Sequence, residues 1–480
     1  MARATIQAMK KVLLINTNTE TQPYPVPPIG LCLLAAQIED KYNVIVFDGT
    51  FCATEDLYKL VKEFNPDYIG FGIRNIDNMV YENQSIYFDK IKANFTEPLR
   101  KISSATFILG GSGFSIYPVA LLDYFGIDIG IIGEAESSFP LLLEHLDNGK
   151  ELTGLQNVII RNRKTYKTTH LKTEKKLSLP FADIDRFISF DPYKTRGAYS
   201  IQTKRGCYHK CIYCSYPLIE GSNYKIRDAK KVADEIEKAY QRLGNVTFEF
   251  VDSTFNDPKI HAENICREII KKGIRPRLRT MGINPRNTSK ELFDLMMKAG
   301  FSQIDCTPDS ASPKMLKILK KNFTLDQLIK TADLIRDNNL PTMWFFLFGG
   351  PGENEQTFAE TFEFIDKYIN PEDMVHMTAG IRIYPGTALH KIAIKERIIS
   401  PDDKLLEPVY YVSPELGMEK LSGMIKEAAK KRYFCVPSYE STPPKEMLIQ
   451  AMELQSKMTV REPMFRTLLR LRKTMMGFPV

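Results

Sequence analysis

Short apolar runs alternate with helical stretches through the first third of this 480-residue chain, and this rhythm limits the folds open to it. Runs that are apolar at successive positions are typical of parallel strands buried on both faces. The expected strands are residues 11–16, 42–48, 68–73, 106–110 and 127–132, with helices at 29–40, 55–64 and 137–146. The pattern predicts an α/β, doubly wound, Rossmann-like domain. Its ligand should lie beyond the carboxyl ends of the strands.

A second strand–helix series begins at Tyr199. The expected strands are residues 199–203, 246–251, 276–280, 303–307, 342–348 and 377–384, with helices such as 229–243 and 326–338. Six such units predict a partial (β/α)6 barrel, an open version of the eight-unit barrel whose sites lie at the carboxyl ends of the strands. From about Asp402 the rhythm stops, and the remainder is expected to form a helical C-terminal cap.

These patterns divide the chain into four parts. We expect a Rossmann-like domain at residues 1–150, a linker at 151–197, the barrel at 198–400 and a helical region at 401–480. Within the linker, residues 153–178 are polar and strand-like.

The composition places few limits on partners. The chain has 65 basic and 58 acidic residues, and this mild excess permits an anionic partner without requiring one. We expect no nucleic acid partner. The apolar run at 12–15 is too short for a signal peptide, and no run reaches the length of a membrane span. The protein is therefore expected to be cytoplasmic, where a disulfide framework is not expected to form.

Three of the eight cysteines fall within eight residues. Cys207, Cys211 and Cys214 follow an expected strand with the spacing Cys-x3-Cys-x2-Cys, whereas the other five are scattered as small buried residues usually are. Thiolates suit iron–sulfur clusters, and three of them on a cubane leave one iron open. A structural zinc site is the alternative, but zinc needs four closed ligands. His209 lies between two of the cysteines, where it is poorly placed to be the fourth.

The segment around these cysteines resembles the Cys-x3-Cys-x-aromatic-Cys signature of the radical S-adenosylmethionine (SAM) superfamily, with Tyr213 as the aromatic residue. The resemblance implies a [4Fe-4S] cluster that binds and cleaves SAM. It also makes four residues at later strand ends candidates for SAM contacts: Asp252, Asp309, Ser310 and Arg382. The sequence departs from the family at residues 252–254, where many members carry Gly-Gly-Glu, and Asp309 replaces a glutamate. The turn that ends at Glu353 matches the family's Gly-x-Pro-Gly-Glu turn.

The N-terminal domain resembles the cobalamin-binding domain of B12-dependent radical SAM enzymes. The resemblance rests on motifs after the first, fourth and fifth strands, at Pro28, Gly30, Gly110, Gly111, Gly133 and Glu134. Arg74 and Asn75 follow the third strand, where they point either to the corrin ring or to solvent as an ordinary polar loop. No histidine follows the first strand, and the first in the chain is His145. A bound cobalamin is therefore expected to lack a histidine lower ligand.

The combined resemblance implies a cobalamin-dependent radical SAM enzyme that methylates an unactivated carbon. In that mechanism a radical generated from SAM activates the substrate, methylcobalamin delivers the methyl group, and a second SAM renews it. A flavodoxin or ferredoxin is the implied electron donor, and the substrate is not defined. The alternatives are a B12-assisted cyclase or rearrangement enzyme and a non-catalytic metal-binding or sensor module. A methylthiotransferase is disfavoured, because that family has a further N-terminal cysteine triad and only Cys32 and Cys52 are available here.

The C-terminal tail carries apolar residues at helical spacing. They are Met464, Phe465, Leu468, Leu469, Leu471 and Met475, with Arg466, Arg470 and Lys473 mainly on the other side. Such a helix either packs on its own domain or lies on a membrane surface. We favour packing, because the segment is only moderately basic.

Overall fold

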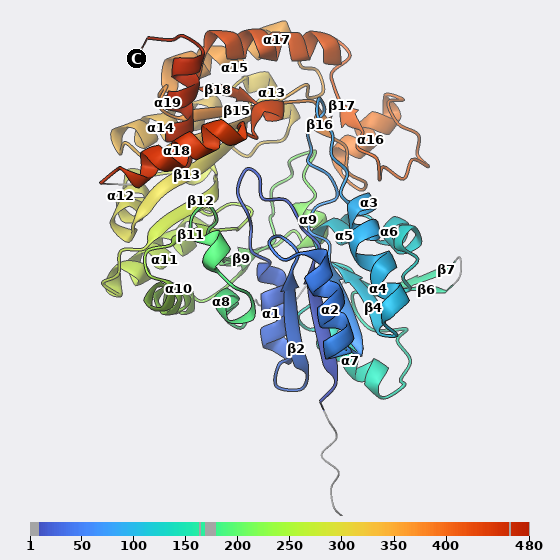
Figure 1. Cartoon of the computed structure of the whole chain (residues 1–480). Helices are drawn as coiled ribbons and strands as arrows, with labels where there is room; N and C mark the ends of the chain where they lie inside the picture. Colours follow the sequence, from blue (N-terminus) through green and yellow to red (C-terminus); the bar gives the residue numbers. More distant parts are fainter. Residues whose placement is uncertain (1–8, 163–164, 169–178, 460–461, 480) are drawn as a thin grey trace, which may run out of the picture. The chain divides into compact units, whose positions relative to one another are not determined.

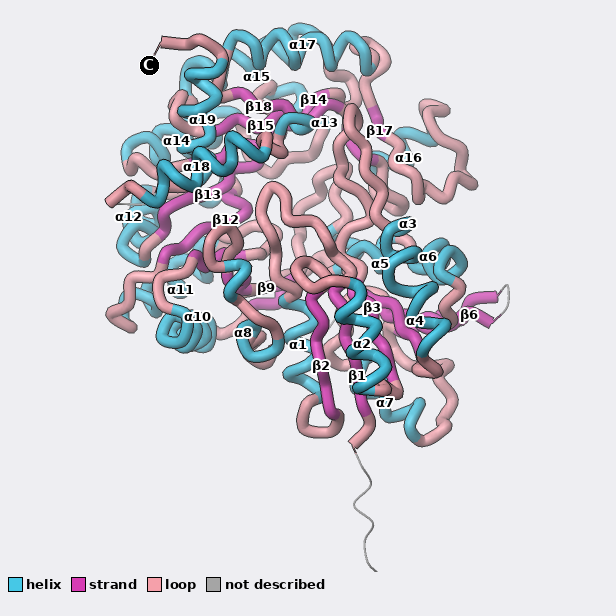
Figure 2. The backbone as a smooth tube through the Cα atoms, viewed as in Figure 1, coloured by secondary structure: helices cyan, strands magenta, loops and turns pink. Residues whose placement is uncertain are grey.

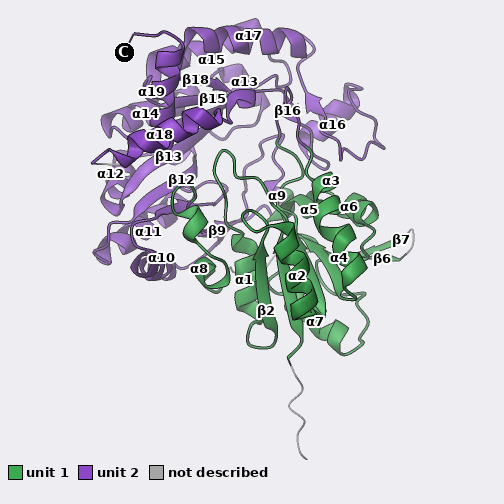
Figure 3. Ribbon diagram, viewed as in Figure 1, with its two compact units in different colours: residues 1–78, 86–197, 218–220 green, residues 79–85, 198–217, 221–480 purple. Residues whose placement is uncertain are grey.

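The computed structural model describes residues 9–162, 165–168, 179–459 and 462–479. The chain forms two compact units, which Figure 3 colours separately. Unit 1 contains residues 1–78, 86–197 and 218–220, and unit 2 contains residues 79–85, 198–217 and 221–480. Part of the polar stretch expected at 153–178 lies outside the described residues.

Unit 1 is built on one seven-stranded sheet in the order β2-β1-β3-β4-β5-β6-β7. Its first five strands are parallel: β1 Lys11–Asn16, β2 Asn43–Asp48, β3 Tyr68–Gly72, β4 Thr106–Gly110 and β5 Ile129–Ile131. Two antiparallel strands, β6 Val158–Asn162 and β7 Thr165–Thr168, extend the edge. The strand order reverses at β1, as in doubly wound folds, which places the switch point between β1 and β3.

The helices of unit 1 follow from the same alternation (Figure 1). They are α1 Ile29–Ile38, α2 Thr54–Phe64, α3 Phe88–Ile91, α4 Glu97–Ile102, α5 Ser112–Ile116, α6 Pro118–Phe125 and α7 Ser138–Asp147. Helix α1 packs with α7, and α2 packs with α4. The expected linker joins this unit through α8 Ile184–Phe187 and through Tyr193, which donates a 2.6 Å hydrogen bond to buried Asp48 at the end of β2.

Unit 2 contains a second sheet, all parallel, in the order β18-β15-β14-β13-β12-β11-β8. The strands are β8 Tyr199–Ile201, β11 Thr247–Phe250, β12 Arg277–Ile283, β13 Phe301–Asp309, β14 Thr342–Phe348, β15 Met374–Ala379 and β18 Cys435–Pro437. The helices between them are α10 Ala229–Leu243, α11 Lys259–Lys271, α12 Lys290–Ala299, α13 Pro313–Ile318, α14 Leu325–Asp337, α15 Glu355–Tyr368 and α17 Met418–Lys431. Figure 2 shows this alternation of strands and helices along the tube.

The observed sheet differs from the expected one in two places. The strand expected at 377–384 is broken at Gly380, whose φ of +75° ends β15, and a separate strand β16 Ile381–Arg382 pairs with β17 Tyr410–Tyr411. The region expected to be helical supplies the seventh strand, β18, which pairs with β15. Three residues that end in a proline are too short to show a strand period, so this strand left no signal in the sequence.

The two faces of the unit 2 sheet differ. In β14 the residues Trp344 and Phe346 pack on Phe364 of α15, with ring centroids 6.2 and 6.5 Å apart. Phe345 and Leu347 alternate with them and are half-buried. Side chains alternate across a strand, so the face away from the helices is the partly open one. This differs from a closed eight-stranded barrel, whose interior is a packed core.

The C-terminal helices cover unit 2. Helix α18 Lys445–Ser456 packs against α19 Met464–Met475, in which Phe465 and Leu469 are buried. Arg466 of α19 lies 3.1 Å from Asp373, which precedes β15. The packing predicted for this helix is confirmed, although Met475 at its end is 70% exposed. In the described parts of the chain, every helix is too short or too polar to cross a membrane.

Candidate functional site

The three clustered cysteines lie on the loop that follows β8 and the short strand β9 Lys204–Arg205. All three are free thiols; Cys207 is buried, and Cys211 and Cys214 are half-buried. Burial raises the pKa of each thiol, that of Cys214 to about 12, where the charges of Cys211 and Cys207 add to the effect. Thiolates brought together under these conditions need a compensating positive charge. The set therefore suits a metal centre better than a lone nucleophile.

The backbone of this loop is fixed on both sides. Gly206 has a φ of +86°, and a Cβ there would lie 2.1 Å from the carbonyl oxygen of Asn223. The next amide, Cys207 N, donates to Gly221 O at 3.1 Å. Only glycine fits at position 206, because both the positive φ and the close approach forbid a side chain. The loop therefore enters the cysteine segment in one backbone conformation.

Ile212, between the second and third cysteines, is held by two other elements. Its amide donates to Leu319 O at 3.3 Å, just after α13, and its carbonyl accepts from Leu389 N at 2.8 Å. Leu389 belongs to α16 Ala388–Lys395. The loop is thus braced by two segments more than a hundred residues further along the chain, which sequence spacing does not reveal.

Asp252, just after β11, holds the backbone that leads into the cluster loop. It is 3% exposed, and its carboxylate accepts from the amides of Thr203 and Lys204 at 2.8 and 3.1 Å and from the Thr203 hydroxyl at 2.5 Å. The buried Lys204 ammonium lies 3.5 Å from it and donates to Phe255 O at 3.1 Å. In this geometry Asp252 positions the start of the cluster loop, and its contact with SAM stays a prediction.

Three side chains, Asp309, Tyr213 and Lys321, meet at the end of β13. Asp309, in a left-handed conformation with φ +65°, accepts hydrogen bonds from the Tyr213 hydroxyl and, at 2.7 Å, from Lys321 Nζ. Burial would lower the pKa of Lys321, but Asp309 and the charges of Cys211 and Cys214 raise it above its usual value. Lys321 is therefore a fixed cation beside two of the three thiols. The sequence indicates Tyr213 and Asp309 but not this lysine, because a buried lysine looks like any other until its partner is known.

The remaining residues singled out in unit 2 make internal contacts. Ser310 Oγ lies 3.1 Å from the Thr361 hydroxyl. The Glu353 carboxylate accepts from the amides of Gly349 and Gly350, and burial raises the pKa of this glutamate to about 7. Arg382 donates to Ile383 O and Leu405 O at 2.9 and 2.8 Å. These contacts shape the carboxyl edge of the sheet, and direct roles in SAM binding stay predictions.

In unit 1 the predicted residues gather at the carboxyl edge of the sheet. Arg74 and Asn75, after β3, line a cleft with Thr17 and Asn18, after β1. The cleft lies at the switch point, where doubly wound folds bind ligands. Thr19, Glu20, Tyr87 and Lys90 also line it.

Several of the predicted residues at this edge are glycines in the loops that follow the strands. Gly111 has a φ of +100°, and a Cβ there would lie 2.4 Å from Ile73 O. Gly110 precedes it at the end of β4, and Gly30 lies in the first turn of α1, just after Pro28, where a Cβ would meet no atom within 4 Å. Gly133 has a φ of +73° and donates its amide to Ser115 Oγ at 2.9 Å, while Glu134 O accepts from Asn157. At Gly111 the glycine is therefore required by the close approach of the loop after β3.

His145 lies at the other end of this sheet. It occupies the last turn of α7, where neighbouring Asp147 bonds Lys10, Tyr42 and Tyr68 at the amino ends of the strands. His145 Nδ1 lies 2.7 Å from Glu151 O. Among the described residues of unit 1, no other histidine occurs, and residue 170 lies outside them. His145 therefore lies away from the carboxyl edge of the sheet, and the absence of a histidine ligand to cobalt stays a prediction.

The residues present fit the implied cofactors. Three thiols on one braced loop match the donor set of a cubane with one open iron, in which each sulfur binds a different iron. Across the described ranges, no three His, Cys, Asp or Glu side chains converge as the ligands of a single ion do. In unit 1, the cleft at the switch point lies at the edge of the sheet where the corrin ring is expected.

Comparison with known proteins gives two family matches. The model of the radical SAM superfamily matches residues 201–365, and the B12 binding domain model matches residues 15–143. The chain is 26% identical over 408 residues to an uncharacterized methyltransferase of Pyrococcus horikoshii, covering 81% of this chain and 84% of that protein. It is 26% identical over 449 residues to tryptophan 2-C-methyltransferase of Streptomyces laurentii, covering 79% and 74%. The solved radical SAM methyltransferase TsrM of Kitasatospora setae, with cobalamin and a [4Fe-4S] cluster bound, has the same fold, with a TM-score of 0.80, 21% identity and 98% of each chain covered.

Proposed function

This chain belongs to the radical SAM enzymes that carry a B12-binding domain, and we propose that it transfers a methyl group from SAM to an unactivated carbon of its substrate. The observation that carries the proposal is the presence of both domains in one chain, each with its candidate residues at the carboxyl edge of a parallel sheet. Relatives named as methyltransferases align with about four fifths of the chain, which favours methylation over cyclisation or rearrangement.

Within this proposal Cys207, Cys211 and Cys214 hold the cluster. Lys321 supplies positive charge beside the thiolates, and Asp309 keeps that lysine and the Tyr213 hydroxyl in place. Gly206 and Asp252 fix the start of the loop. When bound, the cluster and cobalamin supply the cleavage of SAM and the methyl transfer, and the protein orients them and excludes water.

In unit 1, we assign the cobalamin surface to the glycine-lined edge formed by Gly30, Gly110, Gly111 and Gly133, with Arg74 and Asn75 at the switch point. We expect the cobalt to receive no histidine from the described residues of this edge. The reaction needs a reductant and a substrate. The proposal places the enzyme in the cytoplasm, where its eight free cysteines stay reduced.

The proposal is tested by feeding the methyl group. The anaerobically reconstituted protein is incubated with SAM bearing a deuterated methyl group and with metabolite extract from cells that lack the gene. We expect a product whose mass rises by one labelled methyl group and which the Cys207→Ala/Cys211→Ala/Cys214→Ala variant does not form. A product of unchanged carbon count would instead identify a cyclase or rearrangement enzyme. Binding of SAM with no product and no SAM turnover in any extract would favour a sensor module.

A further inference from the structure

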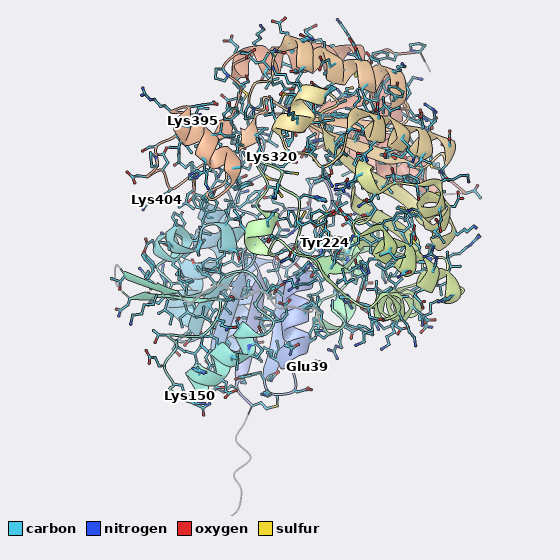
Figure 4. All side chains as sticks on the ribbon, turned by 180° about the vertical axis from the view of Figure 1, so that it is seen from behind. Glu39, Lys150, Tyr224, Lys320, Lys395 and Lys404 are labelled. Carbon is cyan, nitrogen blue, oxygen red and sulfur yellow. The ribbon has the colours of Figure 1, made fainter. Side chains whose placement is uncertain are left out.

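Two side-chain hydroxyls bond the sulfur of Cys207, the first cysteine of the cluster loop. One belongs to Tyr224, which Figure 4 labels, and the other to Ser253, which lies just after β11. The backbone amide of His209 is a third donor to this sulfur. Each of these bonds favours the thiolate, so together they offset part of the rise that burial causes in the pKa of Cys207.

The other two sulfurs of the loop have different surroundings. The Cys211 sulfur is bonded by its own backbone amide, and the Cys214 sulfur by the amide of Tyr216. The positive charge of Lys321 acts on both of these sulfurs and favours their thiolates. The loop therefore has a cation near its second and third cysteines and hydroxyl donors at its first.

The position of Tyr224 follows from a short antiparallel pairing. Strand β10 Lys225–Ile226 pairs with β9, with Lys225 opposite Arg205. In this register Tyr224 is opposite Gly206, the residue that precedes Cys207. The same pairing that leads the chain into the cluster loop therefore brings the tyrosine to the first cysteine.

The neighbours of the Tyr224 hydroxyl direct its proton to the sulfur. The Thr254 hydroxyl lies 3.2 Å away and donates to the tyrosine oxygen. His209 Nε2 lies 3.4 Å from the same oxygen and 2.9 Å from the Asp257 carboxylate. Because a carboxylate only accepts, this nitrogen carries the hydrogen that Asp257 accepts and does not accept one from the tyrosine. The acceptor that remains for the Tyr224 proton is the sulfur of Cys207.

The Ser253 hydroxyl has a choice of two acceptors. Its oxygen lies 3.2 Å from Gly206 O, and it also bonds the sulfur of Cys207. A serine has only one proton to donate. A negatively charged acceptor makes the stronger hydrogen bond, so the proton is directed to the sulfur when Cys207 is a thiolate ligand.

We propose that Tyr224 and Ser253 raise the reduction potential of the cluster by donating hydrogen bonds to the thiolate of Cys207. The inference rests on the proposed function, since it assigns control of the cluster's electron affinity to two residues outside the cysteine signature. On reduction the cluster gains one electron from an external reductant and becomes more negative by one charge. Hydrogen bonds to the sulfurs stabilise that added charge, so the reduced form gains more from them than the oxidised form.

The test compares single-hydroxyl variants of the full-length, cluster-loaded protein. Tyr224→Phe removes the hydroxyl and keeps the ring, and Ser253→Ala removes the second donor. The matched control is Tyr208→Phe, because the Tyr208 ring lies 5.1 Å from that of Tyr224 but its hydroxyl donates to Asp257 at 3.0 Å. The iron content of each protein is measured first. The cluster is then titrated anaerobically with a chemical reductant and mediators, and its reduced form is followed by paramagnetic resonance.

The comparison is made at the potential at which half of the wild-type clusters are reduced. There the ratio of reduced to oxidised cluster should fall at least about threefold in Tyr224→Phe and further in Tyr224→Phe/Ser253→Ala, because the sulfur loses donors. Ser253→Ala alone should lower the ratio by less, since Gly206 O competes for the serine proton. The Tyr208→Phe protein should keep the wild-type ratio, and every variant should keep its iron.

A wild-type or higher ratio in an iron-loaded Tyr224→Phe protein would overturn the proposal. An equal fall in Tyr208→Phe would also overturn it, because the effect would then not depend on the bond to the sulfur. If Tyr224→Phe lost its iron, Ser253→Ala would decide, and a wild-type ratio or loss of iron in that variant would overturn the proposal. Failure of the proposed function is a separate result: the wild-type protein with a fully reduced cluster would turn over no SAM, whereas the potentials could still be compared.

Discussion

Replacing Gly206 with alanine tests whether the cluster loop is held as described. A Cβ at this position lies 2.1 Å from Asn223 O, whereas ordinary contact begins at 3.4 Å, so the two strands must separate by about 1.3 Å (3.4 minus 2.1). That displacement breaks the 3.1 Å bond from Cys207 N to Gly221 O. The positive φ costs about 1–2 kcal/mol and the lost bond about 0.5–1.5 kcal/mol. We therefore expect the free energy of unfolding to fall by roughly 2–3 kcal/mol.

The assay combines urea unfolding of the cluster-free protein with iron and sulfide content after anaerobic reconstitution. Gly273→Ala is the matched control, since Gly273 has a φ of +68° with no atom within 4 Å of an added Cβ. It should lose only the strain of its backbone, about 1–2 kcal/mol, and the protein should keep its iron. The Gly206→Ala protein should lose more stability and most of its iron. Full iron content together with a loss no larger than that of the control would refute the description of the loop.

Three further predictions follow from single sites. Lys321→Met leaves the Asp309 carboxylate without its buried partner and should lower the free energy of unfolding in urea by about 3–5 kcal/mol. The double variant Lys321→Met/Asp309→Asn should recover most of that loss. No recovery would mean that the two groups are not coupled. Burial raises the pKa of Glu353 from 4.5 to about 7, so the folded protein holds this proton after the unfolded chain has lost it. The free energy of unfolding should therefore fall by about 3 kcal/mol as the pH rises from about 4.5 to 7. Glu353→Gln should remove that fall. The raised pKa would be contradicted if the variant and the wild type had the same pH profile of stability. Paramagnetic resonance of bound cob(II)alamin should lack the nitrogen splitting of a protein imidazole, and its presence would show that a histidine such as His145 reaches the cobalt.

The regular elements could be predicted because their signal is local. Apolar runs bounded by turn residues predicted the parallel strands of both sheets within a few residues, and the cysteine spacing predicted the chemistry of the loop. Strand β18 had no such signal, since it is three residues long and exists only because β15 presents an edge to it.

The contacts of the site residues depend on tertiary structure. Asp252 is a candidate for SAM contact, which stays a prediction, and the sequence does not show that its carboxylate accepts from the amides of Thr203 and Lys204, 49 and 48 residues earlier. Lys321 gave no sign of its role because α13 brings it back to Asp309 only after folding. Sequence spacing identifies which side chains carry chemistry, whereas the partners that set their charge and orientation come from distant segments.

The central claim is that one chain holds both an iron–sulfur cluster and cobalamin. It is tested most directly by the iron and cobalamin content per chain of the anaerobically prepared protein. Wild-type protein is compared with the Cys207→Ala/Cys211→Ala/Cys214→Ala variant and with Cys266→Ala/Cys306→Ala/Cys435→Ala, which removes three buried cysteines elsewhere. Wild type and the second variant should hold about four irons per chain and bind cobalamin. The first variant should lose the iron and still bind cobalamin, because the two cofactors are assigned to different units. Iron retained by the first variant, or a wild-type chain that binds no cobalamin, would contradict the account.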